Sequence, residues 1–246
     1  MQSYRTINRL CGWVVFIAAA VVYTLTLESS ASFWDCPEFI TSAARLEVGH
    51  PPGAPFFMLL GNLFSHMAPD VSGIAWCINF MNGLFSAACV MLLFHTITAL
   101  LRRLVVDGAD MPSRWQTASI MAGGLTGALA YAFSDTFWYS AVESEVYACS
   151  SFFTALTFWS ILKWDDCHGS PSADRWLVFI AYLVGLSVGV HLLNLLCIPA
   201  IGLFCYYRLA VRPTLKGSLL AFLLSTAVVA FVLWGVVPGI MKMAGY

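Results

Sequence analysis

The stretch 74–100, IAWCINFMNGLFSAACVMLLFHTITAL, contains no Asp, Glu, Lys or Arg. It is longer than the roughly 20 mostly apolar residues that a helix needs to cross the hydrocarbon core of a bilayer. The whole chain agrees with this stretch, because it is 60% hydrophobic and 10% charged, whereas soluble domains are about 45–50% apolar and about 25% charged. The sequence therefore predicts an all-α polytopic membrane protein.

Working outward from this segment, we expect about seven spanning helices in a single transmembrane domain, residues 1–246. The candidates are 10–27, 74–100, 117–138, 148–163, 175–190, 193–210 and 217–238. The fifth and sixth form a tight hairpin, because together they are too long for one span. Arg5 and Arg9 precede the first segment and no convincing cleavage site follows it, which predicts an uncleaved signal anchor.

The basic residues test this layout. With the N-terminus in the cytoplasm, ten of the twelve Lys and Arg fall at cytoplasmic helix ends, as the positive-inside rule expects. Eight of the thirteen Asp and Glu then lie on the opposite, outer side. A functional site there would explain the excess, and ordinary solvated loops are the alternative. The net charge of -1 gives no sign of nucleic-acid binding.

The first outer loop, residues 28–73, contains SFWDCPEFITSAARLEVGHPPGAPFF at 32–57. The apolar stripe over 36–48 predicts a helix that ends at a Gly49 C-cap before two prolines. The next apolar run, 54–67, is too short to cross a bilayer. We therefore expect two short helices lying on the membrane surface, joined by the GHPPG segment.

Two carboxylates open this loop. Asp35-Cys-Pro-Glu38 has the spacing of a capping box, in which Asp35 caps the helix and Glu38 bonds back to it. The functional alternative is a site at the membrane surface, because Trp34 is typical of the headgroup level and His50 adds a titratable group. A carboxylate near the membrane is costly unless it is paired or used. The two roles are compatible.

The second outer loop, SDTFWYSAVESEVY at 134–147, combines acids with aromatic rings. An aromatic belt with solvated acids is one interpretation. The other is that Glu143 or Glu145 faces Asp35 across a cavity, with Trp138 and Tyr147 nearby. Glu143 and Glu145 would also offer oxygen ligands to a hard divalent cation, but two residues are a weak signal and no metal site is predicted.

Other polar residues lie within or between apolar segments. His191 and Asn194 follow a glycine-spaced helix at 185–189, which predicts a hydrogen-bonded turn and close helix packing. The alternative is a pair of donors for a phosphate or a sugar. Asn79 and Asn82 lie one turn apart in the second span, and we expect them to bond neighbouring helices rather than a ligand.

The chain resembles the membrane proteins catalogued as domain of unknown function 2723. The resemblance rests on FWDCPEFITSAARLEVGHPPGAPFF at 33–57, ESEVY at 143–147 and GLSVGVHLLNLLCIPAIGLF at 185–204. That family includes a protein O-mannosyltransferase of animals, is common in Bacteroidetes and belongs with the GT-C glycosyltransferases. It implies several spans and a catalytic acid in the first outer loop, which corresponds to Asp35 with Glu38 as second candidate.

The resemblance implies an inverting glycosyltransferase that moves a sugar from a polyprenyl-phosphate donor to a Ser or Thr hydroxyl of an exported protein. Asp35 would act as base, and Glu38 would orient the acceptor or Asp35. The leaving phosphate would meet His50, Arg45 or His191. The residues expected to contact substrate are Trp34, Arg45, His50, Trp138, Glu143, Glu145, Tyr147, His191 and Asn194.

Two other functions remain open. One is a lipid or solute transporter, or a flippase, although the sequence shows no internal repeat of the kind transporters carry. The other is a non-catalytic assembly subunit. GT-C enzymes usually have more spans than seven, so we expect the chain to be the N-terminal part of a larger enzyme, completed by a C-terminal domain or a partner subunit. Family distribution favours a bacterial inner membrane.

Overall fold

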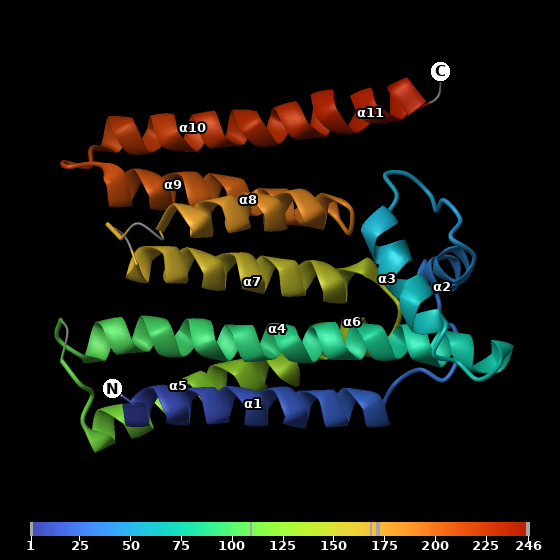
Figure 1. Ribbon diagram of the computed structural model, residues 1–246, viewed down its shortest axis with the longest axis horizontal. Helices are drawn as coiled ribbons and strands as arrows, with labels where there is room; N and C mark the ends of the chain where they lie inside the picture. The colour runs from blue at the N-terminus through green and yellow to red at the C-terminus, as the bar shows by residue number, and fades with distance from the viewer. Residues whose placement is uncertain (1, 109, 168, 171–172, 245–246) are drawn as a thin grey trace.

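The computed structural model describes residues 2–108, 110–167, 169–170 and 173–244. These residues form helices and no strand. Most helices run along one long axis, and α2 and α3 lie at one end of the bundle in other directions (Figure 1). The elements are α1 Gln2–Leu25, α2 Cys36–Arg45, α3 Pro55–Ser65, η1 Val71–Gly73, α4 Ile74–Val105, α5 Arg114–Ala132, α6 Asp135–Val142, α7 Val146–Asp166, α8 Ala173–Val188, η2 Leu192–Leu196, α9 Cys197–Leu209, α10 Leu215–Phe231, η3 Val232–Val236 and α11 Val237–Ala244.

The long helix α4 lies at the centre and packs against α1, α5 and α7. Its buried Val90 and Phe94 belong to a core that also contains Val15 of α1 and Ile120 of α5. Gly124 lets α5 approach α4 closely, because a Cβ atom there would lie 2.5 Å from the Thr98 side chain. Beyond α7 come α8 and α9, and α10 with α11 forms the outermost layer (Figure 1).

Four helical segments of the described chain are long and apolar enough to cross a membrane: Ser3–Leu25, Val71–Val105, Leu192–Leu209 and Leu215–Gly239. The predicted class, a helical membrane protein, is therefore confirmed, and the count of seven spans stays a prediction. The remaining predicted segments overlap α5, α7 and α8. The prediction of one continuous helix over 117–138 is wrong. The helix α5 ends at Ala132, and α6 starts again at Asp135.

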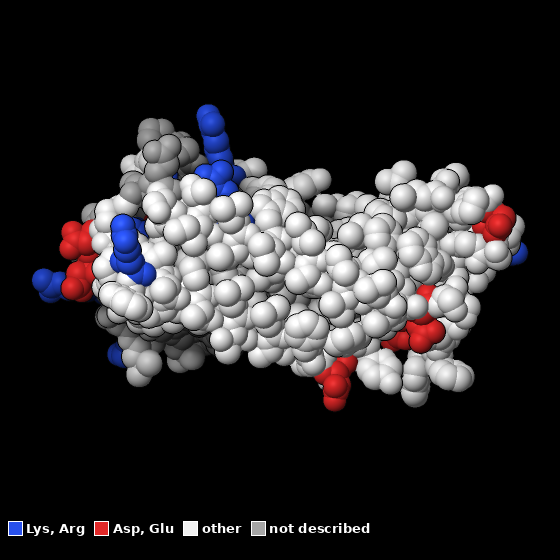
Figure 2. All heavy atoms as spheres, turned by 90° about the horizontal axis from the view of Figure 1, so that it is seen from below, with Lys and Arg blue, Asp and Glu red and all other residues white. Residues whose placement is uncertain are grey.

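On the face shown in Figure 2, charged residues gather toward the two ends of the bundle, and few lie between them. Because the helices alternate in direction, their basic termini meet at the end where α1 begins (Figure 1). We call this the basic end; it carries Arg5, Arg9, Arg102, Arg103, Arg114, Lys163, Arg175, Arg208, Arg212 and Lys216. The predicted sorting of Lys and Arg to one side is thus confirmed within the molecule. The other end is the α2–α3 end.

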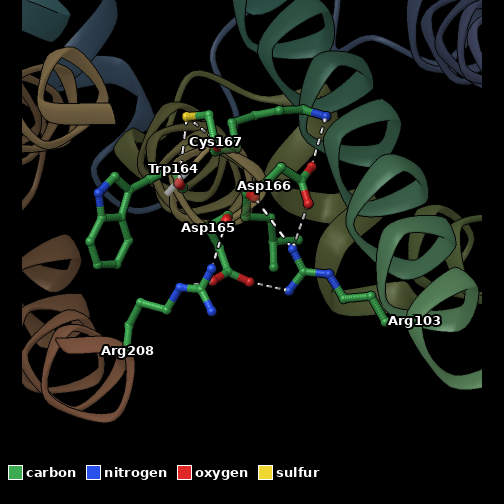
Figure 3. A network of polar contacts seen from close by, with 8 residues as sticks. Arg103, Trp164, Asp165, Asp166, Cys167 and Arg208 are labelled. Atoms are coloured by element: carbon green, nitrogen blue, oxygen red, sulfur yellow. Dashed lines mark hydrogen bonds and ion pairs between the residues drawn. The ribbon is translucent and has the colours of Figure 1, made fainter. Parts of the chain in front are cut away.

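Ion pairs tie three helices together at the basic end (Figure 3). The guanidinium of Arg103, at the end of α4, lies 2.7 Å from the Asp165 carboxylate and 2.8 Å from that of Asp166, both in α7. Asp165 also pairs with Arg208 of α9 at 2.9 Å. The Asp165 side chain is only 17% exposed, so solvent screens these contacts less than it screens surface ion pairs.

The two short helices expected in the first loop are present, α2 and α3, but α2 ends earlier than predicted. Leu46, not Gly49, takes the left-handed conformation that closes the helix, and its backbone N–H bonds to the Ala43 carbonyl. The Gly49 C-cap prediction is therefore wrong. Phe39 of α2 and Phe57 of α3 are buried in a second core with Met81 of α4, which fixes this helix pair on the bundle.

Candidate functional site

Two asparagines of α4 hold the two acidic loops at the α2–α3 end. The side-chain amide of Asn79 donates to the carbonyls of Glu28 and Ser30 at 2.8 and 3.1 Å. One turn later, Asn82 donates to the carbonyls of Glu143 and Glu145 at 2.6 and 3.0 Å. Both asparagines are fully buried. They place the segment that leads to Asp35 beside the Glu143–Glu145 segment.

The sequence predicted that Asn79 and Asn82 bond neighbouring helices, and this is wrong. Their side-chain amides bond loop carbonyls instead, those of Glu28 and Ser30 for Asn79 and those of Glu143 and Glu145 for Asn82. The only signal was two amides spaced one turn apart in an otherwise apolar span. That spacing places both on one helix face, but it does not say which segments that face meets.

Glu38 holds His50. The Glu38 Oε1 atom accepts from the His50 backbone N–H at 2.6 Å, and both carboxylate oxygens lie 3.1 Å from the His50 Nδ1 atom. These hydrogen bonds to His50 hold the pKa of Glu38 below its ordinary value. Gly49 allows the contact, since a Cβ atom there would lie 3.0 Å from Glu38 Oε1.

The predicted capping box is wrong. Asp35 occupies the N-cap position of α2, but its side chain makes no capping hydrogen bond. Glu38 bonds forward to His50 instead of back to the helix start. The GHPPG segment brings His50 over α2, so that Glu38 meets both the backbone N–H and the ring of His50. Hydrogen bonds to an ionised carboxylate are stronger than hydrogen bonds between neutral groups.

Three carboxylates share one electrostatic environment. Glu145 is buried, and its pKa is raised to about 7, chiefly by this burial and then by the negative charges of Glu143 and Asp35, while His50 opposes the shift. Glu143 accepts a hydrogen bond from Ser32 at 2.5 Å. The charge of Asp35 thus reaches Glu145, while the expected cavity between Asp35 and the Glu143–Glu145 segment stays a prediction. The residues come from loops more than a hundred positions apart.

The two tryptophans behave differently. Trp34 is 93% exposed and has a positive φ of 63°. This conformation is uncommon for a bulky residue, and strained backbone of this kind is often found at functional sites. Trp138 turns into the bundle, where its Nε1 atom donates to Thr26 Oγ1 at 3.1 Å and its ring packs against Tyr23 and Phe133. Trp138 therefore joins helices and offers little surface to a ligand.

In the turn between α8 and α9, Asn194 is buried and His191 is only partly buried. Asn194 is buried and bonds to Ser187 at 2.7 Å and to Thr154 at 3.0 Å, which fits the predicted turn. His191 accepts from the Leu193 N–H at its Nδ1 atom, and burial lowers its pKa. Its ring lies 5.4 Å from the ring of Tyr147, which is half exposed.

The glycine spacing at 185–189 predicted close packing, and one glycine provides it. A Cβ atom at Gly189 would lie 2.9 Å from Phe56 of α3, and the Gly189 carbonyl accepts from the Phe56 N–H at 2.7 Å. Among the described residues, and leaving aside the backbone of its own helix, no atom lies within 4 Å of a Cβ atom at Gly185, so the packing prediction is wrong there. Arg45 lies at the surface, 3.7 Å from Glu47. Among the described residues, no three His, Cys, Asp or Glu form a group that could hold a metal ion.

Comparison with known protein families finds a match that starts at residue 35. A family model, the protein O-mannosyl-transferase TMEM260 N-terminal domain, matches residues 35–214. The chain belongs to this family. The match begins at Asp35 and covers every candidate site residue except Trp34. It runs from α2 to α9 and includes the Glu143–Glu145 segment, while α1, α10 and α11 lie outside it.

Two curated relatives agree with this family. The mouse protein named protein O-mannosyl-transferase TMEM260 is 30% identical over 206 residues, which cover 84% of this chain and 27% of the mouse protein. The Dictyostelium discoideum protein of the same name is 29% identical over 147 residues, 59% of this chain and 16% of that protein. The chain thus spans about a quarter of the mouse relative. No solved structure matches.

Proposed function

We propose that this chain carries the transfer site of a glycosyltransferase, which moves mannose or a similar sugar from a polyprenyl-phosphate donor to a Ser or Thr hydroxyl of an exported protein. The observation that carries the proposal is that Asn79 and Asn82 hold the segment before Asp35 beside the Glu143–Glu145 segment, where the charge of Asp35 reaches Glu145. Family membership supports the reaction class, because the mouse and Dictyostelium relatives are named protein O-mannosyl-transferases.

Asp35 is the proposed base. Its side chain makes no capping hydrogen bond and is exposed, so an acceptor hydroxyl can reach it. The hydroxyl oxygen attacks the anomeric carbon while its proton passes to Asp35. The bond from that carbon to the phosphate oxygen breaks, and polyprenyl phosphate leaves from the opposite face, so the configuration inverts. A positioned base of this kind contributes about 10²–10⁴-fold.

His50 is the first candidate to meet the leaving phosphate. Glu38 engages its backbone N–H and its Nδ1 atom, which orients the ring and leaves Nε2 as the nitrogen available to a phosphate oxygen. Glu38 is therefore a positioning residue in this proposal rather than a second base. His191 is a further donor, since its Nδ1 atom is occupied by Leu193. Arg45 is less suited because it already pairs with Glu47.

Trp34 and Glu145 suit the sugar. The ring of Trp34 is exposed and free to stack on a pyranose face. The pKa of Glu145 is raised to about 7, chiefly by burial, so its neutral carboxyl form is accessible near neutral pH. In that form its carboxyl group can donate a hydrogen bond to a sugar hydroxyl, which an ionised carboxylate cannot do.

The lipid part of the donor would have an apolar surface. A groove of about 600 Å³ lies between α8, α9 and the π-helical segment η3. Its lining is apolar and includes Val188 at the end of α8, three residues before His191. A polyprenyl chain held there would place its phosphate at the α2–α3 end, which in the proposed topology faces the non-cytoplasmic side of the bacterial inner membrane.

The test compares mannose transfer by the wild-type protein and by Asp35→Asn in lipid nanodiscs, with a short-chain polyprenyl-phosphate mannose donor and a Ser/Thr peptide acceptor. Asp70→Asn is the matched control, because Asp70 lies in the same loop but caps η1. We expect Asp35→Asn to lose at least about 10²-fold in kcat and Asp70→Asn to retain activity. Equal turnover by Asp35→Asn would remove Asp35 as base. An inactive wild type, with all sugars tried, would favour an assembly subunit.

A further inference from the structure

The basic end contains a cavity far from the acidic loops. It has a volume of about 550 Å³ and lies between the start of α1, the end of α4, the end of α7 and the segment before α5. Five of the described residues that line it are basic, and one, Asp166, is acidic. The basic ones are Arg5, Arg9, Arg102, Arg103 and Lys163. No part of the proposed transfer site uses this cavity.

The protein neutralises only part of this charge. Arg103 pairs with Asp165 and Asp166 (Figure 3). Lys163 lies 3.8 Å from Asp166. The three remaining arginines make no ion pair with any carboxylate that the structure describes; these are Arg5, Arg9 and Arg102. About three positive charges at this cavity are therefore left without a carboxylate partner among the described residues.

The polar groups of the cavity wall are also incompletely satisfied. Arg102 is half-buried with its guanidinium 5.8 Å from the centre of the Tyr4 ring, and its enclosed Nε atom has no hydrogen-bond partner. The enclosed Oδ1 atom of Asn8 has none either, although its amide nitrogen lies 3.4 Å from His95 Nδ1. Such atoms are rare in folded proteins, because each costs free energy. Both atoms belong to residues that line this cavity, so the described residues do not satisfy all the polar groups of its wall.

Arginines that converge on a hollow suit a phosphate group, since a guanidinium matches phosphate oxygens with two parallel hydrogen bonds. The position also fits: the apolar part of α1 starts at Leu10, directly after Arg9, so the cavity lies at headgroup depth. Basic pockets between membrane helices bind anionic headgroups. Trp159 and Met111 add apolar wall for the glycerol or acyl part.

We propose that the cavity between α1, α4 and α7 at the basic end binds the phosphate group of an anionic phospholipid. Arg5, Arg9 and Arg102 supply the charge, and Trp159 contacts the lipid body. The bound headgroup joins α1 to α4 and α7 in addition to the ion pairs of Asp165 and Asp166. The site is independent of sugar transfer, because it lies at the opposite end of the bundle.

The test is native mass spectrometry of the delipidated protein titrated with dioleoyl phosphatidylglycerol, dioleoyl phosphatidylcholine or inorganic phosphate. We compare the wild type with Arg102→Gln and Arg9→Gln, and use Arg212→Gln as the matched control. Arg212 is an exposed arginine of the same end that does not line the cavity. We expect phosphatidylglycerol to bind more tightly than phosphatidylcholine, and each cavity variant to weaken it about fivefold.

Arg9→Gln keeps the test decisive if Arg102→Gln fails to fold, since Arg9 is exposed. Equal binding of the two lipids, or equal effects of Arg9→Gln and Arg212→Gln, would overturn the proposal. Inorganic phosphate that binds in this cavity and displaces phosphatidylglycerol at comparable concentration would overturn the lipid as occupant and make the site one for a free anion. Failure of sugar transfer has no bearing on any of these readouts.

Discussion

Replacing Glu145 by Gln tests whether the Glu145 side chain is buried near the other carboxylates, as it is in the structure. Glu145 is 7% exposed, and its carboxyl group has a pKa of about 7 in place of the ordinary 4.5, chiefly because it is buried and then because Glu143 and Asp35 are negative. Gln keeps the shape and removes the titration. The substitution should therefore change how stability depends on pH.

The sign and size follow from linkage. The folded protein holds the Glu145 proton more tightly than the unfolded chain does, so this group's contribution to stability is full below pH about 4.5 and is lost as the pH rises through about 7. At about 1.4 kcal/mol for each tenfold change in proton affinity, the whole loss is about 3 kcal/mol. Between pH about 5 and about 8, Glu145→Gln should gain about 2–3 kcal/mol over the wild type.

The assay is reversible unfolding in mixed detergent micelles, with the fraction of sodium dodecyl sulfate increased at each pH and the folded fraction followed by tryptophan fluorescence. Glu47→Gln is the control, because Glu47 is an exposed carboxylate at the same end. The difference between Glu145→Gln and the wild type should grow with pH, while that of Glu47→Gln should not grow in this way. Parallel curves for the wild type and Glu145→Gln would refute the burial of Glu145 among the other acids.

Two further substitutions test the supports of the bundle. Asn82→Ala removes two hydrogen bonds to the 143–145 segment, should cost about 1–3 kcal/mol of stability and should also lower mannose transfer. The control Asn62→Ala also removes two amide-to-carbonyl bonds but should cost stability alone. Equal mannose transfer by the two variants would contradict the role of Asn82. Asp165→Asn breaks two ion pairs and should cost about 1.5–3 kcal/mol of stability in the same unfolding assay. The control Asp174→Asn, at an exposed acid of the same end, should leave stability unchanged. Equal effects of the two substitutions would contradict the ion-pair network.

The sequence was sufficient wherever the physical cause is local or comes from the solvent. Apolar length predicted the helices, because a bilayer cannot satisfy bare backbone groups. The distribution of Lys and Arg predicted which helix termini share an end, since alternation of the helices requires it. The α2–α3 pair was predicted from its apolar stripe and prolines, although the end of α2 was not, because a left-handed Leu46 has no signature in the residue type.

The candidate site divides in the same way. The residue types of the first loop indicated Asp35, Glu38 and His50 as a group, but local rules favoured a capping box, and the fold of the GHPPG segment gave Glu38 a stronger partner in His50. Similarly, the sequence around each tryptophan does not indicate that Trp138 packs inward while Trp34 stays exposed. Which way a ring turns depends on neighbours that are distant in the sequence.

What the sequence determined by itself is the class, most of the helical segments and the end at which Lys and Arg collect, because these follow from hydropathy, length and charge along the chain. Only the tertiary structure decided that Asn79 and Asn82 fasten two loops together, that Glu145 is buried beside Glu143 and Asp35, and that three arginines surround one cavity. Hydrogen bonds and charges act over a few ångströms in space, and the distances that matter here are set by how α1, α4 and α7 pack.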